Sequence, residues 1–385
     1  TRDLLRLVRR EPWGSPGEGG RMLARRVAPA QGTMPGGFPR IRRARRFASP
    51  VERRLAVVII PAPATLILTQ DQPALVRRMS GSRELHRVRP GVFVATATWN
   101  KLAPWDRYLL RVHAVLLTWT DPTLCLESAA VVRGLPIFGE PREVHLLSPD
   151  ATTWHAGDVV VHGARDGREL DVLDGTSVTS VTDTAVDLAR VLPPAFALGF
   201  ADAALRRIGE ETAPDFSARG RSQQNRRGLR QLDWVQARAT PKAESVGESV
   251  SRAAIEWLGY EAPELQVVFR HEGAADRCDF FWREQRIIGE SDGYGKYDAS
   301  DADEVKAHFV REKKREDRLR RHEGGVVRWD WADTVRGKPL DEKLRAGGLS
   351  PVRRPHTALL ATLSSNPRSL TPLRRTTAVS SKRTS

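Results

Sequence analysis

The spacing of hydrophobic and polar residues predicts helices alternating with short strands along most of the chain. Between residues 244 and 331, apolar residues recur first every three or four positions, as in a helix, and then in short strand-like runs. The predicted order is a helix over 244–260, strands over 265–270, 278–282 and 286–292, a charged helix over 301–322 and a strand over 326–331. We therefore expect this region to fold as an α-β-β-β-α-β unit.

Two of these predicted strands carry the candidate chemistry. Asp279 lies in one strand, and Glu290 and Asp292 lie two positions apart at the end of the next. Because side chains alternate along a strand, Glu290 and Asp292 share a face, and an antiparallel neighbour can bring Asp279 beside them. Clustered carboxylates raise one another's pKa unless a cation joins them, and such oxygen ligands suit Mg²⁺ or Mn²⁺. The alternative is a set of solvated strand ends followed by an ordinary Asp-Gly turn.

Local motifs surround these carboxylates. They are Glu248-Ser249-x-x-Arg252, Pro263-x-x-Gln266, Asp279-Phe280-x-Trp282, Glu290-x-Asp292-Gly293-x-x-Lys296-Tyr297, Glu312-Lys313-x-Arg315-Glu316-x-x-Leu319 and Val327-Arg328-Trp329. Together with the element order, they make residues 244–348 resemble the PD-(D/E)XK nuclease core, in the branch of very-short-patch-repair endonucleases. They also resemble bacterial proteins in which this core follows a region like the AbiEi abortive-infection antitoxin.

The resemblance implies roles for individual residues. Metal ligands would be Asp279, Glu290 and Asp292, with Lys296, Glu248 and Gln266 assisting catalysis, and Lys313, Arg315 and Arg328 holding the DNA backbone. This chain departs from the family at Asp292, where the usual motif has a lysine. Two interpretations remain open: Lys296 takes over the role of that lysine, or the site binds metal poorly and cuts nothing.

Residues 57–98 suggest a second module. A helix over 71–80 is followed by two strands within 85–94, joined at Pro90-Gly91. This resembles the end of an antitoxin-like winged helix-turn-helix, in which a wing follows the recognition helix. Five arginines are then expected to contact DNA phosphates: Arg77, Arg78, Arg83, Arg87 and Arg89. The alternative is a small packing module whose arginines are only solvated.

Residues 99–210 predict a mixed α/β region without a catalytic constellation. Helices are expected over 105–119, from 126 to about 133, over 182–190 and 195–207, and strands over 143–147, 159–162 and 178–180. We interpret Glu127, Asp187 and Asp202 as helix caps or helix-surface charges. The motifs Ser128-Ala129-Ala130 and Gly134-Leu135-Pro136 match the middle of the antitoxin-like group. Residues 211–243 are polar and basic and are predicted to be a linker, or a helix leading into the nuclease-like core.

The charge of the chain is concentrated at its ends. The net charge is +15, of which residues 1–56 contribute +10 and residues 351–385 contribute +7, so the remainder is near −2. Basicity alone is therefore a weak argument for DNA binding by the folded part. We predict that residues 1–56 are a disordered basic arm, or translated sequence upstream of the true start, and that residues 349–385 are a disordered basic tail.

Several classes of protein are not expected. No membrane span or export signal is visible, and Cys125 and Cys278 lack metal-binding spacing, so we predict a cytoplasmic location with reduced thiols. The predicted fold is α+β or α/β and multidomain: winged-helix-like, then mixed α/β, then restriction-endonuclease-like. The predicted function is a Mg²⁺-dependent (or Mn²⁺-dependent) DNA endonuclease in defence or repair. The alternative is an antitoxin-like DNA-binding regulator with an inactive nuclease fold. DNA is the expected partner, and a homodimer and a toxin partner are left open.

Overall fold

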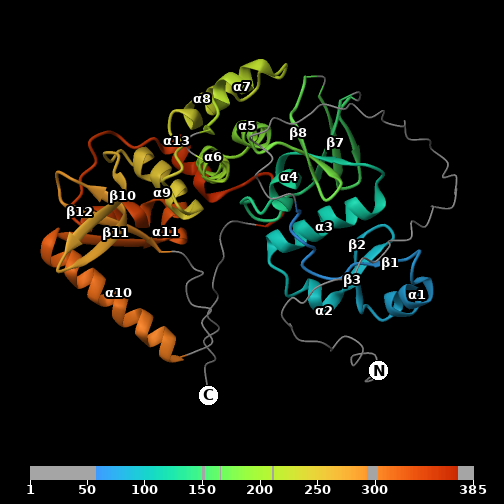
Figure 1. Ribbon diagram of the computed structural model, residues 1–385, viewed down its shortest axis with the longest axis horizontal. Helices are drawn as coiled ribbons and strands as arrows, with labels where there is room; N and C mark the ends of the chain where they lie inside the picture. The colour runs from blue at the N-terminus through green and yellow to red at the C-terminus, as the bar shows by residue number, and fades with distance from the viewer. Residues whose placement is uncertain (1–57, 150–151, 165, 210–211, 293–301, 372–385) are drawn as a thin grey trace, which may run out of the picture. The chain divides into compact units, whose positions relative to one another are not determined.

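The computed structural model describes residues 58–149, 152–164, 166–209, 212–292 and 302–371 (Figure 1). Within these ranges the chain is a mixed α/β protein whose strands form three sheets. This confirms the mixed α/β class predicted from the sequence. The arm predicted at 1–56 and the expected catalytic Lys296 lie outside the described residues.

The first sheet is small and antiparallel. It contains β1 (Ile67–Leu68), β2 (Leu85–Arg89) and β3 (Val92–Ala95) in the order β1-β3-β2, with α1 (Pro73–Gly81) between β1 and β2. Gly91 has a φ of +78°, so the Pro90-Gly91 turn uses a backbone conformation that glycine adopts without strain. Helix α2 (Thr96–Trp99) follows. The predicted helix, strand, turn and strand are therefore present in that order.

The second sheet has six strands in the order β6-β7-β5-β4-β9-β8. Its strands are β4 (Thr123–Leu124), β5 (Val144–Ser148), β6 (Trp154–Ala156), β7 (Val159–Gly163), β8 (Leu170–Leu173) and β9 (Thr176–Thr179). Its helices are α3 (Pro104–Thr118), α4 (Leu126–Val132), α5 (Val181–Val191) and α6 (Pro194–Ile208). Helix α3 packs on this sheet through Tyr108 and Val112, which share a core with Val144, Val159 and Val161.

The third sheet has the order β10-β11-β12-β13, with β12 and β13 parallel and the other pairs antiparallel. Its elements are α9 (Val246–Trp257), β10 (Glu264–His271), β11 (Ala274–Trp282), β12 (Ile287–Asp292), α10 (Ala302–His322) and β13 (Gly325–Asp330). They follow one another in the order expected from the hydrophobic pattern. Two helices cover different sides: Phe280 and Trp329 share a core with α9, whereas Phe281 and Ile288 pack against Leu319 of α10 (Figure 1).

Residues 212–243 are not a simple linker, and of our two alternatives the helical one is the closer, with two short helices in place of one. They contain α7 (Phe216–Ser222) and α8 (Leu229–Gln236). Phe216, Leu232 and Val235 are fully buried in the same core as Val186 of α5. These few apolar residues are separated by charged ones, and their burial depends on a surface that α5 and α6 supply. The polar composition of this segment therefore did not indicate that its few apolar residues are buried.

The prediction of a disordered tail from residue 349 is also wrong as far as residue 371. After α11 (Trp331–Arg336) and α12 (Lys338–Ala346), the chain forms α13 (Thr357–Leu360) and the 3-10 helix η3 (Ala361–Ser364). Leu349 and Leu363 are buried. Residues 366–371, here named the C-terminal strap, then pair with the segment before β5 through a Pro141–Ser369 bridge. Residues 372–385 lie outside the described residues.

No helix in the described ranges combines the length and the apolar character needed to cross a membrane.

Candidate active site

Asp279 and Glu290 lie where β11 and β12 separate. The antiparallel register of these strands ends at Phe280–Gly289, so Asp279 and Glu290 occupy the next opposed positions. There the Asp279 carboxylate accepts a hydrogen bond from the backbone N–H of Ser291, at 2.9 Å. Burial and, to a smaller extent, the negative charges of Glu290 and Asp279 raise the pKa of the Cys278 thiol to about 12. The two acidic residues therefore lie near Cys278 at one end of the sheet.

The alternation of side chains breaks beside this point. On β10, Leu265 packs with the α9 core while Val267 packs with the α10 core, although the two residues are two apart. On β11, Cys278 and Phe280 differ in the same way. The intervening residues, Gln266 and Asp279, are skipped by the register between the pairs Leu265–Phe280 and Val267–Cys278, and Gln266 has a φ of +55°. A local irregularity of this kind re-aims side chains, and such irregularities are frequent next to active sites.

Glu290 is a nearly buried carboxylate with an arginine partner. Its side chain accepts a hydrogen bond from Arg315 of α10 at 2.7 Å. Burial raises the pKa of Glu290, and the Arg315 guanidinium opposes this shift. Asp292 lies 3.5 Å from Arg328 of β13, so Glu290 and Asp292 both face cations on the α10 side. The prediction that these two carboxylates share one face is confirmed.

Arg315 and Arg328 are joined through Glu312. Its Oε1 accepts from Arg315 at 2.8 Å and from Arg328 at 2.6 Å, and Arg328 also lies 3.4 Å from Glu316. The two guanidinium groups that we expected on the DNA backbone are thus engaged with carboxylates of the protein. Lys313, the third expected contact, is exposed.

Glu248 and Gln266 form a separate pair on the α9 side. Ser245 caps α9 by accepting from the Glu248 N–H at 3.1 Å. The Glu248 carboxylate accepts from the Glu244 N–H at 2.8 Å and from the Gln266 amide at 2.9 Å. Glu248 and Gln266 therefore join α9 to β10, whereas Glu290 and Asp292 face cations of α10 and β13.

The carboxylates offer hard oxygen donors in small number. Within the described ranges, no three or more His, Cys, Asp or Glu side chains are grouped so that they could hold a metal ion. Asp279 and Glu290 remain as a pair, with Asp292 tied to Arg328. A pair of carboxylates suits Mg²⁺ because this ion usually keeps several waters and takes further ligands from a substrate phosphate.

The arginines of the first sheet divide into two groups. Arg77, Arg78, Arg83 and Arg87 are exposed, and none of them forms an ion pair with any described residue. Arg89 is only 9% exposed, and its guanidinium forms an ion pair with Asp158. Arg89 therefore anchors β2 to the second sheet and is not free for phosphate, contrary to its expected role.

A buried polar centre in the second sheet was not anticipated. Glu127 and His145 are each 2% exposed, and Arg368 of the C-terminal strap reaches both of them. Arg368 donates to Glu127 Oε2 at 2.7 Å and to His145 Nε2 at 2.9 Å, and His145 Nδ1 lies 3.0 Å from His162 Nε2. Glu127 is therefore not a helix-surface charge. The partner that neutralises it lies 241 positions away, so local sequence contained no signal for it.

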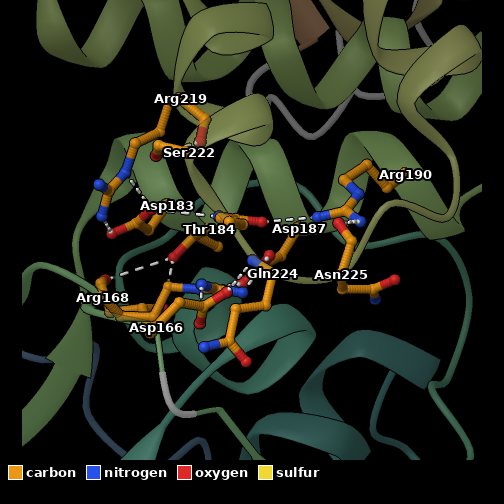
Figure 2. Close-up of polar contacts among 12 residues, drawn as sticks. Asp166, Arg168, Asp183, Thr184, Asp187, Arg190, Arg219, Ser222, Gln224 and Asn225 are labelled. Carbon is orange, nitrogen blue, oxygen red and sulfur yellow. Dashed lines mark hydrogen bonds and ion pairs between the residues drawn. The ribbon is translucent and has the colours of Figure 1, made fainter.

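A second buried ion network lies between α5, α7 and the loop before β8 (Figure 2). Arg219 donates to both oxygens of Asp183, at 2.7 and 2.6 Å. Arg168 contacts Asp166 at 2.5 Å and both oxygens of Asp187 at 3.2 Å. Asp187 is thus a partly buried acid paired with Arg168, and burial raises its pKa. Asp202 is fully buried as well and is paired with Arg252.

Comparison with known proteins identifies two similar proteins and no matching protein family. The chain matches no protein-family model. It is similar to the uncharacterized proteins MT2308 and Rv2248 of two Mycobacterium tuberculosis strains, with 32% identity over 167 residues in each case. The matched segment is 43% of this chain and 60% of each relative, so the chain spans less than two thirds of the proteins that it matches.

Proposed function

We propose that the chain is a metal-dependent endonuclease that hydrolyses DNA phosphodiester bonds, with residues 244–348 as a nuclease domain of the PD-(D/E)XK type. One observation carries the proposal: Asp279 and Glu290 follow the last paired residues of β11 and β12, in a four-stranded mixed sheet with α9 and α10 on its two sides. Strand geometry holds these two carboxylates in place at one end of the sheet.

Asp279 and Glu290 would hold Mg²⁺ or Mn²⁺. When bound, the metal would polarise a phosphate and lower the pKa of a water molecule. Asp279 is oriented by the Ser291 N–H, which donates to one of its oxygens. Burial raises the pKa of Glu290, but the Arg315 guanidinium opposes this and favours the ionised carboxylate. An ionised carboxylate is the form that would bind a cation.

Gln266 and Glu248 would act behind this pair. The Gln266 amide is fixed by Glu248, and Gln266 lies with a positive φ at the point where the β10–β11 register is interrupted beside Asp279. We assign this pair the role of supporting the geometry around Asp279. Lys296 keeps its proposed role of positioning the attacking water, on sequence grounds alone.

Cleavage of plasmid and oligonucleotide DNA with Mg²⁺ or Mn²⁺ tests the proposal. The wild type is compared with Asp279→Ala, Glu290→Ala and the matched control Asp317→Ala, which removes an exposed carboxylate from α10. We expect cutting by the wild type and the control, and none by the two site variants. Equal cutting by all four proteins would identify a contaminant, and no cutting by any of them would reject the nuclease function. RNA substrates, run in parallel, test the assignment of DNA.

A second candidate function is a DNA-binding regulator with an inactive nuclease fold. The observation that favours it is the group of exposed arginines on α1, β2 and the turn between them: Arg77, Arg78, Arg83 and Arg87. The element order β1-α1-β2-β3 resembles a recognition helix followed by a wing. In this case substitution of these arginines abolishes DNA binding, whereas Asp279→Ala and removal of metal leave binding unchanged.

A further inference from the structure

The turn between α7 and α8 carries a cluster of arginines. Residues 219–230 contain five arginines and no acidic residue. Arg219 and Arg221 are neutralised by Asp183 and Asp233, at 2.6 and 2.7 Å. The other three, Arg226, Arg227 and Arg230, are exposed and form no ion pair with any residue that the structure describes. We call residues 223–230 the basic turn.

The basic turn is fixed to α5 by one arginine. Arg190 donates from all three of its guanidinium nitrogens: to the Arg227 carbonyl at 2.7 Å, to the Gln223 side chain at 2.6 Å and to the Asn225 carbonyl. Figure 2 shows Arg190 and Asn225 side by side on the border of the ion network. A guanidinium that donates to three residues of one turn restricts the conformation of that turn.

Further contacts hold the first residues of the basic turn and Gly228. The Gln224 N–H donates to Asp166 at 2.7 Å, and Asp166 is held by Arg168, which in turn is held by Asp187 (Figure 2). Gly228 lies so close to α5 that an added Cβ would stand 2.6 Å from the Arg190 carbonyl oxygen, and its φ is +77°. The turn is therefore built into the protein surface.

Buried ion networks are a costly way to gain stability. Replacing buried charges by apolar groups of the same volume is often neutral or stabilising, so geometry is the best explanation for keeping them. Here the geometry that the network determines is that of a polar surface turn. Its outward side chains are cations, and no exposed large hydrophobic side chain lies in it.

We propose that the basic turn binds the phosphate backbone of a nucleic acid. Guanidinium groups match phosphate oxygens in a bidentate way, and a fixed turn loses little conformational entropy when it binds. The turn carries no apolar anchor for a protein partner, which favours a polyanion. This inference rests on the proposed function for the choice of nucleic acid as the ligand. It adds a contact surface outside residues 244–348.

Salt-dependent binding of the full chain to duplex DNA and to RNA tests the inference. The triple variant Arg226→Gln, Arg227→Gln, Arg230→Gln is compared with the matched control Arg336→Gln, Arg353→Gln, Arg354→Gln, which also removes three exposed charges. Loss of three phosphate contacts should reduce the slope of log Kd against log salt concentration by about 2.7. We expect this loss in the triple variant and an unchanged slope in the control.

A further variant tests the fixed geometry. Arg190→Gln removes one charge but releases the basic turn, so we expect its slope to fall by more than the value of about 0.9 for one contact. Thermal unfolding shows whether each variant is folded. Equal slopes for the wild type and the triple variant, or a wild type that binds no nucleic acid, would overturn the inference. Failure of the nuclease function looks different: no protein cuts DNA, yet the triple variant still loses its slope.

Discussion

The Arg315 guanidinium donates to the Glu290 carboxylate at 2.7 Å, between helix α10 and strand β12. Their side chains are 20% and 10% exposed, so the pair is largely removed from water. A carboxylate in this position would lose much of its tendency to ionise without the guanidinium. The pair thus explains how an acid can be kept charged at the end of a buried strand.

Arg315→Ala is expected to lower the free energy of unfolding by about 1–3 kcal/mol, because it leaves the buried Glu290 carboxylate without its partner. Adding Glu290→Gln should recover part of the loss. Urea unfolding measures both variants. The matched control is Arg320→Ala, which breaks the more exposed i,i+4 pair with Glu316 on the same helix and should cost no more than about 0.5 kcal/mol. A loss in the control as large as that of Arg315→Ala would contradict the special position of Glu290.

Arg89→Ala should act on stability and not on DNA affinity. Its side chain is buried against Asp158, so we expect unfolding to become easier by about 1–3 kcal/mol. Arg87→Ala, two positions away and exposed, is the control and should leave the unfolding midpoint unchanged. DNA binding of the two variants, measured beside their melting curves, should show the reverse order. Weaker binding by a fully stable Arg89→Ala protein would return Arg89 to the group of DNA contacts.

Arg368→Ala is expected to destabilise the protein by about 3–5 kcal/mol. Burial alone would raise the pKa of Glu127, and the Arg368 guanidinium holds it below its ordinary value, so removal of Arg368 leaves a buried carboxylate uncompensated. Arg354→Ala removes an exposed arginine from the same terminal segment and serves as the control. If Glu127→Gln in the Arg368→Ala background restores none of the lost stability, the ion pair is not the cause.

Stability should fall as the solution becomes acidic below about pH 6.5, the ordinary pKa of histidine. Burial is the main cause that lowers the pKa of His145 to about 3 and that of His162 to about 4. Between pH 6.5 and these values the unfolded chain binds protons that the folded chain does not. Each histidine then lowers stability by about 1.4 kcal/mol per pH unit.

Urea unfolding at pH 7 and pH 5 measures this dependence. His145→Gln should flatten the acid limb, whereas His155→Gln, at an exposed histidine of β6, should keep the profile of the wild type. An acid limb that is equally steep in the His145→Gln protein would show that other groups cause it.

The order of elements in the third sheet was predicted correctly because apolar residues recur there with regular helix and strand periods. The apolar spacing of α9 and the bulky runs of β11 and β12 led to the correct element order, and Glu290 and Asp292 follow the period of two. That period could not show where alternation breaks. The re-aiming of Gln266 and Asp279 results from contacts with α9 and Ser291, and these contacts exist only in the folded protein.

Long-range pairs account for the other differences. The composition of the terminal segment predicts a polar, disordered chain. In the structure, hydrogen bonds to Glu127 and His145 hold Arg368 in place. In the same way, arginines such as Arg219 and Arg221 gave residues 211–243 the composition of a charged linker. Their acidic partners, Asp183 and Asp233, lie on α5 and α8. Composition describes the solvation of a segment by itself, and it does not describe charges that are neutralised elsewhere in the chain.

The C-terminal strap also determines when folding can be completed during synthesis. Glu127 leaves the ribosome 241 residues before Arg368, which neutralises it, and domains otherwise tend to fold from the N-terminus as they emerge. Throughout that interval the Glu127 carboxylate of α4 has no guanidinium to pair with it. The packing of α4 against the second sheet is therefore completed only after residue 368 has been synthesised, and a ribosome stalled before that codon would carry this region with an unpaired acid.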